Sequence, residues 1–267
     1  MEEPRDHQSD SLEIKPVKAL SGLNWLGEAF SLMFKAPGSW LGMFVLFLLI
    51  AFFMSSFEFL QILASVLSPI FMGGFMFAAD KARQGKSVMI DDLFAGFKQA
   101  FRPLFRLGLL YLAMNILIVV ILGFFVEQQL TAEQVKAVQQ ASTTAEMEQV
   151  LREYPRLADV FISALLWLFV LLIPVMMASW MAPALILLAG AGPIDALKLS
   201  FMASAKNWLA FTVLGVALIP LYIMALMPLF LGMLVMMPIT FICQYLAFAD
   251  IFQITQDEPE NQDTFLV

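Results

Sequence analysis

Six apolar runs dominate the sequence and restrict the chain to folds that can place them in a bilayer. Most of them approach or exceed the roughly 20 residues that a helix needs to cross the hydrocarbon core. Backbone polar groups find no water there, so runs of this kind predict membrane-spanning helices. Their bounds are 40–54, 57–79, 107–126, 161–188, 209–226 and 229–249. The sequence therefore predicts an all-α integral membrane protein with six transmembrane helices.

The composition agrees with this and excludes several kinds of site. Charged residues make up 14% of the chain and hydrophobic residues 61%, whereas soluble domains average roughly 25% charged. The single cysteine, Cys243, lies in an apolar run and allows no disulfide framework. The single histidine, His7, lies in a polar tail, so we expect no histidine-built metal site. The net charge of −7 comes from acids concentrated in the tails and one loop, and does not indicate a basic partner.

Amphipathic segments precede three pairs of apolar runs. Gly192-Pro193 opens one of them, and Asp195 suits the start of a helix. Apolar residues at helical spacing predict that each segment is a helix lying in the membrane surface. The second segment lies in a stretch rich in lysine and arginine, residues 80–106, here called the basic connector. The predicted membrane-interface residues are Phe30 and Phe34 in segment 19–37, Leu93, Phe97 and Phe101 in the basic connector, and Leu197, Phe201 and Trp208 in segment 192–208.

The chain shows signs of a threefold internal repeat of about 70 residues. Pro69, Pro183 and Pro238 lie in the second span of each pair, and Asp80 and Asp250 follow their prolines at nearly the same distance. This predicts three hairpins, each preceded by an interfacial helix. The alternative is chance matching between apolar sequences. The prolines would serve packing geometry, or they would bend the spans around a central cavity.

Domain bounds follow from polarity. We expect a disordered cytoplasmic tail at 1–16, one six-span domain at 17–250 and an acidic cytoplasmic tail at 251–267. Segment 127–157 is a polar insertion in which Thr131–Gln134 and Thr143–Glu146 match capping boxes, so it should form two short helices outside the bilayer. Pro174 is expected to kink the long fourth run.

Three polar residues within the apolar runs are candidates for function. Glu58 is either a headgroup-level residue at a helix start or an intramembrane carboxylate. Asn115 is most simply an interhelical hydrogen-bonding residue. Gln244 completes the set. The set is small for a proton or ion pathway.

The distribution of basic residues predicts the orientation. With six spans, twelve of the fifteen lysines and arginines fall on one side of the membrane, together with both termini. The other three, in segment 127–157, are Lys136, Arg152 and Arg156. Both termini and the three amphipathic segments are therefore expected at the cytoplasmic face, where basic residues attract anionic lipid.

Four segments carry a resemblance to known proteins: 181–200 (MAPALILLAGAGPIDALKLS) with Asn207-Trp208, 17–26 (VKALSGLNWL), 69–74 (PIFMGG) and 92–97 (DLFAGF). They resemble an uncharacterised family of proteobacterial inner-membrane proteins, akin to the membrane domain of bacterial glycerophosphodiester phosphodiesterases. The resemblance covers about 17–250 and implies a bacterial inner membrane. Its motifs are structural, and this chain has no phosphodiesterase domain.

No phosphate-cradling glycine loop, nucleophile elbow or zinc signature occurs, so no catalytic, cofactor-binding or metal-binding residue is predicted. The first functional hypothesis is a non-enzymatic membrane protein that organises lipid or partner proteins at the cytoplasmic leaflet. The alternative is a transporter or channel for a small or amphiphilic molecule, and a lipid-directed enzyme comes third. Expected partners are membrane lipids, other membrane proteins or a second copy of the chain, with no nucleic acid.

Overall fold

The structure is a computed structural model that describes residues 12–253. Every regular element in this range is a helix. The predicted tails fall partly outside it, because residues 1–11 and 254–267 are not among the described residues. Lys15, in the predicted N-terminal tail, and Val17, the first residue after it, are both held in place. The Lys15 N–H donates to the Ile251 carbonyl at 3.0 Å, and the Val17 N–H donates to the Asn207 side chain at 2.7 Å. The ordered domain therefore begins before residue 17.

The six apolar runs form helices long and apolar enough to cross a membrane, which confirms the all-α prediction with six candidate spans. They are α2 (Pro37–Ser55), α3 (Glu58–Arg83), α5 (Phe101–Glu127), α8 (Arg156–Trp180) continued by α9 (Ala182–Ala189), α11 (Trp208–Leu226) and α12 (Met233–Ile251). α2 packs against α3, and α11 against α12. Their arrangement as hairpins across a bilayer stays a prediction.

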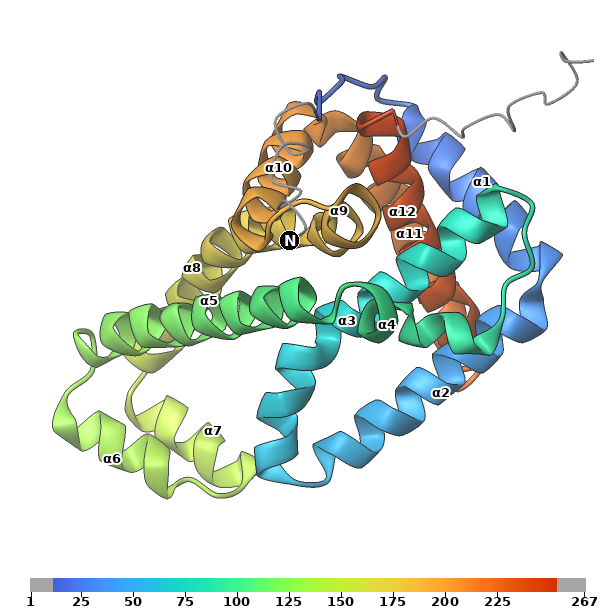
Figure 1. The fold of residues 1–267 in the computed structure, drawn as a ribbon. Coiled ribbons are helices and arrows are strands. Elements are labelled where there is room, and N and C mark those ends of the chain that lie inside the picture. Colours follow the sequence, from blue (N-terminus) through green and yellow to red (C-terminus); the bar gives the residue numbers. More distant parts are fainter. Residues whose placement is uncertain (1–11, 254–267) are drawn as a thin grey trace, which may run out of the picture. The chain divides into compact units, whose positions relative to one another are not determined.

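The chain divides into two compact units, one formed by the residues up to 109 together with those from 177 onward, and the other by residues 110–176. In the larger unit, α3, α9 and α12 contact one another, and α3 and α12 are the most buried of the candidate spans (Figure 1). Pro69, Pro183 and Pro238 are all buried in these helices. Glycine allows close approach here: a Cβ added to Gly74 would lie 2.1 Å from the Leu93 carbonyl oxygen.

Each amphipathic segment packs on one of these proline-containing helices. α1 (Ser21–Lys35) packs on α12, and α10 (Pro193–Lys206) packs on α9. The basic connector supplies the 3₁₀ helix η2 (Ile90–Phe94) and α4 (Ala95–Gln99), which pack on α3. This regular pattern agrees with the predicted repeat. The repeat itself, and the location of these elements in a membrane interface, stay predictions.

The basic connector differs from the single amphipathic helix expected there. It is broken into η2, α4 and the first turns of α5, with Ala100 in a non-helical conformation (φ −142°, ψ 37°). The physical reason is Pro103, whose ring would clash with the carbonyl of Gln99 in a continuous helix. Proline is tolerated in the first turn of a helix, so α5 begins at Phe101 and not near 107.

The fourth apolar run is also interrupted, close to Pro183. α8 runs through Pro174 to Trp180, and the break falls at Met181. Pro183 then occupies the first turn of α9, where its missing N–H costs nothing. The expected kink at Pro174 stays a prediction, and the break at Met181 is an additional interruption that the sequence reading did not place.

The smaller unit contains the polar insertion. As predicted, the insertion forms two short helices, α6 (Ala132–Gln140) and α7 (Thr144–Glu153). Both capping boxes are present, with Thr131 paired to Gln134 and Thr143 paired to Glu146. In the same unit, the ring of Phe125 in α5 contacts the ring of Trp167 in α8, and the two ring centroids are 6.1 Å apart.

Candidate functional site

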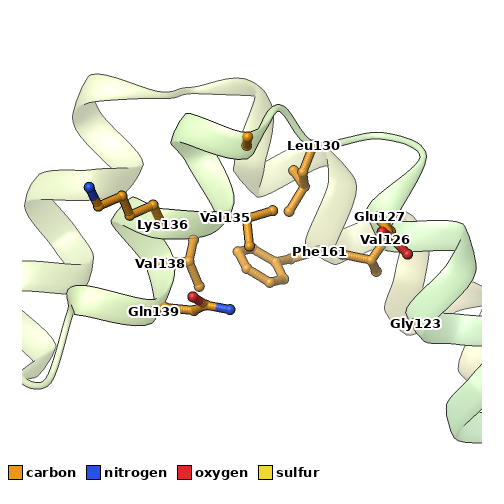
Figure 2. Close-up of a pocket in the computed structure, with 10 residues that line it drawn as sticks. Gly123, Val126, Glu127, Leu130, Val135, Lys136, Val138, Gln139 and Phe161 are labelled. Carbon is orange, nitrogen blue, oxygen red and sulfur yellow. The ribbon is translucent and has the colours of Figure 1, made fainter.

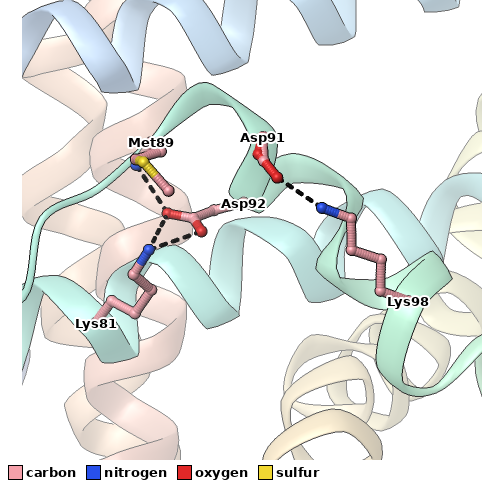
Figure 3. Close-up of polar contacts among 5 residues, drawn as sticks. All are labelled: Lys81, Met89, Asp91, Asp92 and Lys98. Carbon is pink, nitrogen blue, oxygen red and sulfur yellow. Dashed lines mark hydrogen bonds and ion pairs between the residues drawn. The ribbon is translucent and has the colours of Figure 1, made fainter.

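Two adjacent aspartates in η2 hold the basic connector in place. They point in different directions, Asp92 toward Lys81 of α3 and Asp91 toward Lys98 of α4 (Figure 3). Asp92 accepts hydrogen bonds from the Lys81 ammonium at 2.8 Å on both oxygens and from the Met89 N–H at 2.8 Å. Its side chain is only 7% exposed. Asp92 therefore fastens the connector to the end of a candidate span, while Asp91 forms an exposed ion pair.

Lys98 lowers the pKa of the Asp91 carboxyl, first by its hydrogen bond and then by its charge. A depressed carboxyl pKa stabilises the fold above the ordinary value of 3.8, and this contribution is lost as pH falls through the folded value. We expect the Lys98→Met variant to unfold at a lower temperature than the wild type at neutral pH. The two should converge as the pH falls below 3.8 and through the lowered pKa of Asp91. Circular dichroism melts of detergent-solubilised protein would measure this, and a difference that persists at acidic pH would contradict it.

The pairing of these charges leaves three cations of the basic connector without an acidic partner among residues 12–253. One is Lys86, whose ammonium donates to the neutral Gln84 side chain at 2.6 Å, and the others are two arginines. Lys81 and Lys98 are bound to aspartates, and Arg83 pairs with Glu28 of α1 at 3.4 Å. Arg102 and Arg106 are both exposed and have no acidic partner within residues 12–253. They lie four residues apart in the first turns of α5, so they share one side of that helix.

Aromatic rings accompany these arginines along the connector. The ring centroid of Phe97 lies 5.2 Å from that of Phe71 in α3. Further along the connector, the ring centroids of Phe97 and Phe101 are 6.1 Å apart, and those of Phe101 and Phe105 are 5.6 Å apart. Phe101 is 44% exposed. The start of α5 therefore presents free guanidinium groups beside exposed apolar surface, a combination suited to the boundary between lipid headgroups and acyl chains.

The break between α8 and α9 is the second polar cluster of the larger unit. The Ser200 hydroxyl accepts from the Met181 N–H at 3.0 Å and donates to the Met177 carbonyl at 2.8 Å. Ser204 also donates to Met177, at 3.2 Å, and the Gln244 amide donates to the Trp180 carbonyl. Side chains from α10 and α12 thus satisfy backbone groups that the helix break exposes, as a non-helical backbone inside a membrane domain requires.

Ser200 should contribute more to stability than Ser204. Ser200→Ala leaves the Met181 N–H unpaired in a buried site, at a cost of about 1–3 kcal/mol. Ser204→Ala removes only one of two donors to the same carbonyl and should cost less. Thermal unfolding of the two variants in detergent would compare them, and equal midpoints would argue against the role assigned to Ser200.

The predicted membrane-interface residues differ in exposure. Leu93 is fully buried against Gly74, so it contacts protein and does not belong to a lipid-facing set. The other members are half-buried (Phe30, Phe97, Leu197) or exposed (Phe34, Phe101, Phe201, Trp208). In α10 the buried face consists of small residues, Ala196, Ser200, Ala203 and Ser204. Three large apolar residues of that helix, Ile194, Phe201 and Met202, are exposed.

The three polar candidates occupy different environments. Glu58 is the exposed first residue of α3, where its charge suits the helix N-terminus. Asn115 is exposed and donates to the Tyr111 carbonyl of its own helix at 2.8 Å, so this bond is not interhelical. Gln244 is buried at the α8–α9 break. The structure thus brings Gln244 into a polar cluster and leaves the other two outside it.

Sequence reasoning missed the polar bonds that join the ends of α1, α3 and α12. The Tyr245 hydroxyl donates to Asp80 at 2.7 Å, and the Trp25 indole donates to Asp250 at 3.0 Å. The matching positions of Asp80 and Asp250 after their prolines were the available signal. Their partners lie 165 and 225 residues away in the chain, so spacing could not identify them.

The smaller unit contains an open pocket of about 760 Å³ between α6 and the adjoining ends of α5 and α8. Phe161 extends toward Leu130 and Val135 inside it (Figure 2). Its polar lining includes one acid, Glu127, and one base, Lys136. The pocket is therefore mainly apolar and shows no preference for one ligand charge.

Comparisons of the chain with protein-family models, with curated proteins and with solved structures found no match.

Proposed function

We propose that this protein is a non-enzymatic multi-pass protein of a bacterial inner membrane that binds and organises anionic lipid at the cytoplasmic leaflet. The basic connector is the proposed contact surface. The charge asymmetry of the sequence supports this orientation, with both termini cytoplasmic. The resemblance stated above supports the bacterial inner membrane. Other membrane proteins, or a second copy of the chain, are proposed partners for the exposed faces of the spans.

One observation carries the proposal. Arg102 and Arg106 are exposed on one side of α5, at the start of a candidate span, without acidic partners among residues 12–253. Lys81 and Lys98 are bound to aspartates, and the Lys81–Asp92 pair links the connector to α3. The two guanidinium groups are thus held at the level where a span enters a membrane. Arginine forms paired hydrogen bonds with phosphate oxygens.

The test compares two pairs of arginines with the same spacing. Arg102→Gln/Arg106→Gln removes the proposed contact, and Arg152→Gln/Arg156→Gln removes two exposed arginines from the polar insertion. Each basic residue contributes about 1 kcal/mol to anionic lipid attraction, so the first double variant should bind phosphatidylglycerol roughly thirtyfold more weakly. Each variant is exchanged between nanodiscs of phosphatidylglycerol and of phosphatidylcholine. Native mass spectrometry of the lipids that stay bound then measures its relative affinity for phosphatidylglycerol. An equal loss in both double variants, or in neither, would contradict the proposal.

A second candidate function is transport of a small or amphiphilic molecule. The observation that favours it is the break between α8 and α9, because interrupted spans with polar side chains at the break form substrate sites in transporters. Gln244 is the residue that this function would require at the break. Swelling of proteoliposomes in glycerol, followed by light scattering, tests it. Uptake that is absent, or unchanged by Gln244→Leu, would count against transport of this probe.

A further inference from the structure

A second cationic site lies in the larger unit, away from Arg102 and Arg106. A cavity of about 380 Å³ opens between the end of α1, the corner that leads into α2 and the loop after α3. Two cationic residues, Lys35 and Lys86, line it, and its lining contains no acidic residue. The Lys86 ammonium also donates to the neutral Gln84 side chain at 2.6 Å. Lys35 is two residues before α2 and Lys86 three residues after α3. Because α2 and α3 are candidate spans, the cavity lies where the chain would enter and leave the bilayer.

Unused hydrogen-bond donors accompany these charges. Ser87 lines the cavity, and neither its hydroxyl nor its N–H has a hydrogen-bond partner within the described part of the chain. Ala36 lines it as well and is the N-cap residue of α2, where no side chain caps the helix. The Ala36 N–H donates to the Met33 carbonyl at 3.3 Å and Pro37 has no N–H, so the start of α2 adds only the positive end of its dipole to the two lysines.

Local structure fixes the geometry of this cavity. Gly85 adopts a left-handed conformation (φ 72°) and ends α3. The Lys86 N–H donates to the Lys81 carbonyl at 2.9 Å and the Gly85 N–H to the Ala82 carbonyl at 3.1 Å, which is the Schellman pattern. These bonds occupy the last carbonyls of α3. On the opposite side, the buried Trp40 indole donates to the Leu32 carbonyl at 3.3 Å and holds the α1–α2 corner.

From these groups we propose that the cavity binds a phosphate group, with the Lys35 and Lys86 ammonium groups and the Ser87 donors as its ligands. Lysine ammonium groups bind phosphate, and the positive end of the α2 dipole adds to their attraction for an anion. The phosphate belongs either to a lipid headgroup or to a soluble phosphate ester. The lipid form of this inference rests on the proposed function, because it places a headgroup site at the same leaflet.

The experiment uses the full chain in nanodiscs that contain phosphatidylglycerol with a photoreactive group beside the phosphate. Wild-type protein should be labelled within residues 32–38 or 84–88. Lys35→Gln/Lys86→Gln should reduce labelling there roughly thirtyfold, whereas Arg102→Gln/Arg106→Gln should leave labelling at this cavity in place. Both lysines are exposed, so the variant should keep its thermal midpoint, which is measured alongside.

A soluble arm identifies the source of the phosphate. Titration calorimetry with glycerol 3-phosphate that shows binding dependent on Lys35 and Lys86 indicates a soluble ester. Labelling by lipid without such binding indicates a headgroup. If Arg102→Gln/Arg106→Gln loses its preference for phosphatidylglycerol while labelling at the cavity persists, the result supports this site. It also shows that the cavity binds independently of the two arginines. Labelling unchanged in Lys35→Gln/Lys86→Gln, or neither labelling nor titration in wild-type protein, would overturn the inference.

Discussion

Lys81→Met is expected to lower the free energy of unfolding by roughly 3 kcal/mol, because it leaves the Asp92 carboxylate buried without its cation. The Lys81 side chain is 18% exposed and that of Asp92 7%, and their charged atoms are 2.8 Å apart. Thermal or denaturant unfolding in detergent measures the loss. The same variant should also loosen the basic connector, since Asp92 is its polar link to α3.

Lys98→Met provides the matched control. It breaks the neighbouring ion pair, whose two side chains are 61% and 60% exposed, so its effect at neutral pH should be much smaller. A double variant, Lys81→Met/Asp92→Asn, should recover part of the lost stability because no unpaired charge stays buried. If Lys81→Met and Lys98→Met lower the free energy of unfolding equally, burial does not decide how much these ion pairs stabilise the fold.

Gly74→Ala should also be strongly destabilising, by about 1–3 kcal/mol. A Cβ at this position would lie 2.1 Å from the carbonyl oxygen and 2.8 Å from the Cα of Leu93. These are backbone atoms, so no side-chain rotation relieves the clash, and η2 must move away from α3. Because Lys81 and Asp92 join the same two elements, Gly74→Ala should also weaken that ion pair.

Gly215→Ala is the control for this substitution. Gly215 is also in a helix, α11, but an added Cβ there meets nothing within 4 Å. Alanine favours a helix more than glycine does, so this variant should be neutral or slightly stabilising. Comparison of the two thermal midpoints in detergent tests the close packing of η2 on α3. A neutral Gly74→Ala variant would contradict it.

Hydrophobic runs were sufficient to predict the six candidate spans, because a bilayer imposes a length on each of them. The capping boxes of α6 and α7 were equally predictable, since they depend on residues three positions apart. The breaks were harder to place. Pro103 and Pro183 interrupt helices, whereas α8 continues through Pro174. Which proline ends a helix depends on tertiary partners, such as the Ser200 hydroxyl that binds the Met181 N–H.

The candidate sites were less predictable than the helices. Apolar periodicity placed Leu93 with Phe97 and Phe101 on one stripe, but Leu93 is buried against Gly74 while Phe101 is exposed. Periodicity cannot distinguish a face that contacts lipid from one that contacts protein, since both are apolar. The polar contacts across the fold, such as Tyr245 with Asp80, join residues distant in sequence and required the tertiary structure.

The orientation of the chain in its membrane is the claim on which the lipid proposals depend most. It can be measured with single cysteines introduced as Lys98→Cys in the basic connector and Lys136→Cys in the polar insertion. The native Cys243 is buried and should contribute little background. A membrane-impermeant maleimide added to intact cells should label Lys136→Cys directly and label Lys98→Cys only after the membrane is permeabilised. Labelling of both cysteines from the same side, or of Lys98→Cys alone from outside, would contradict the proposed cytoplasmic surface.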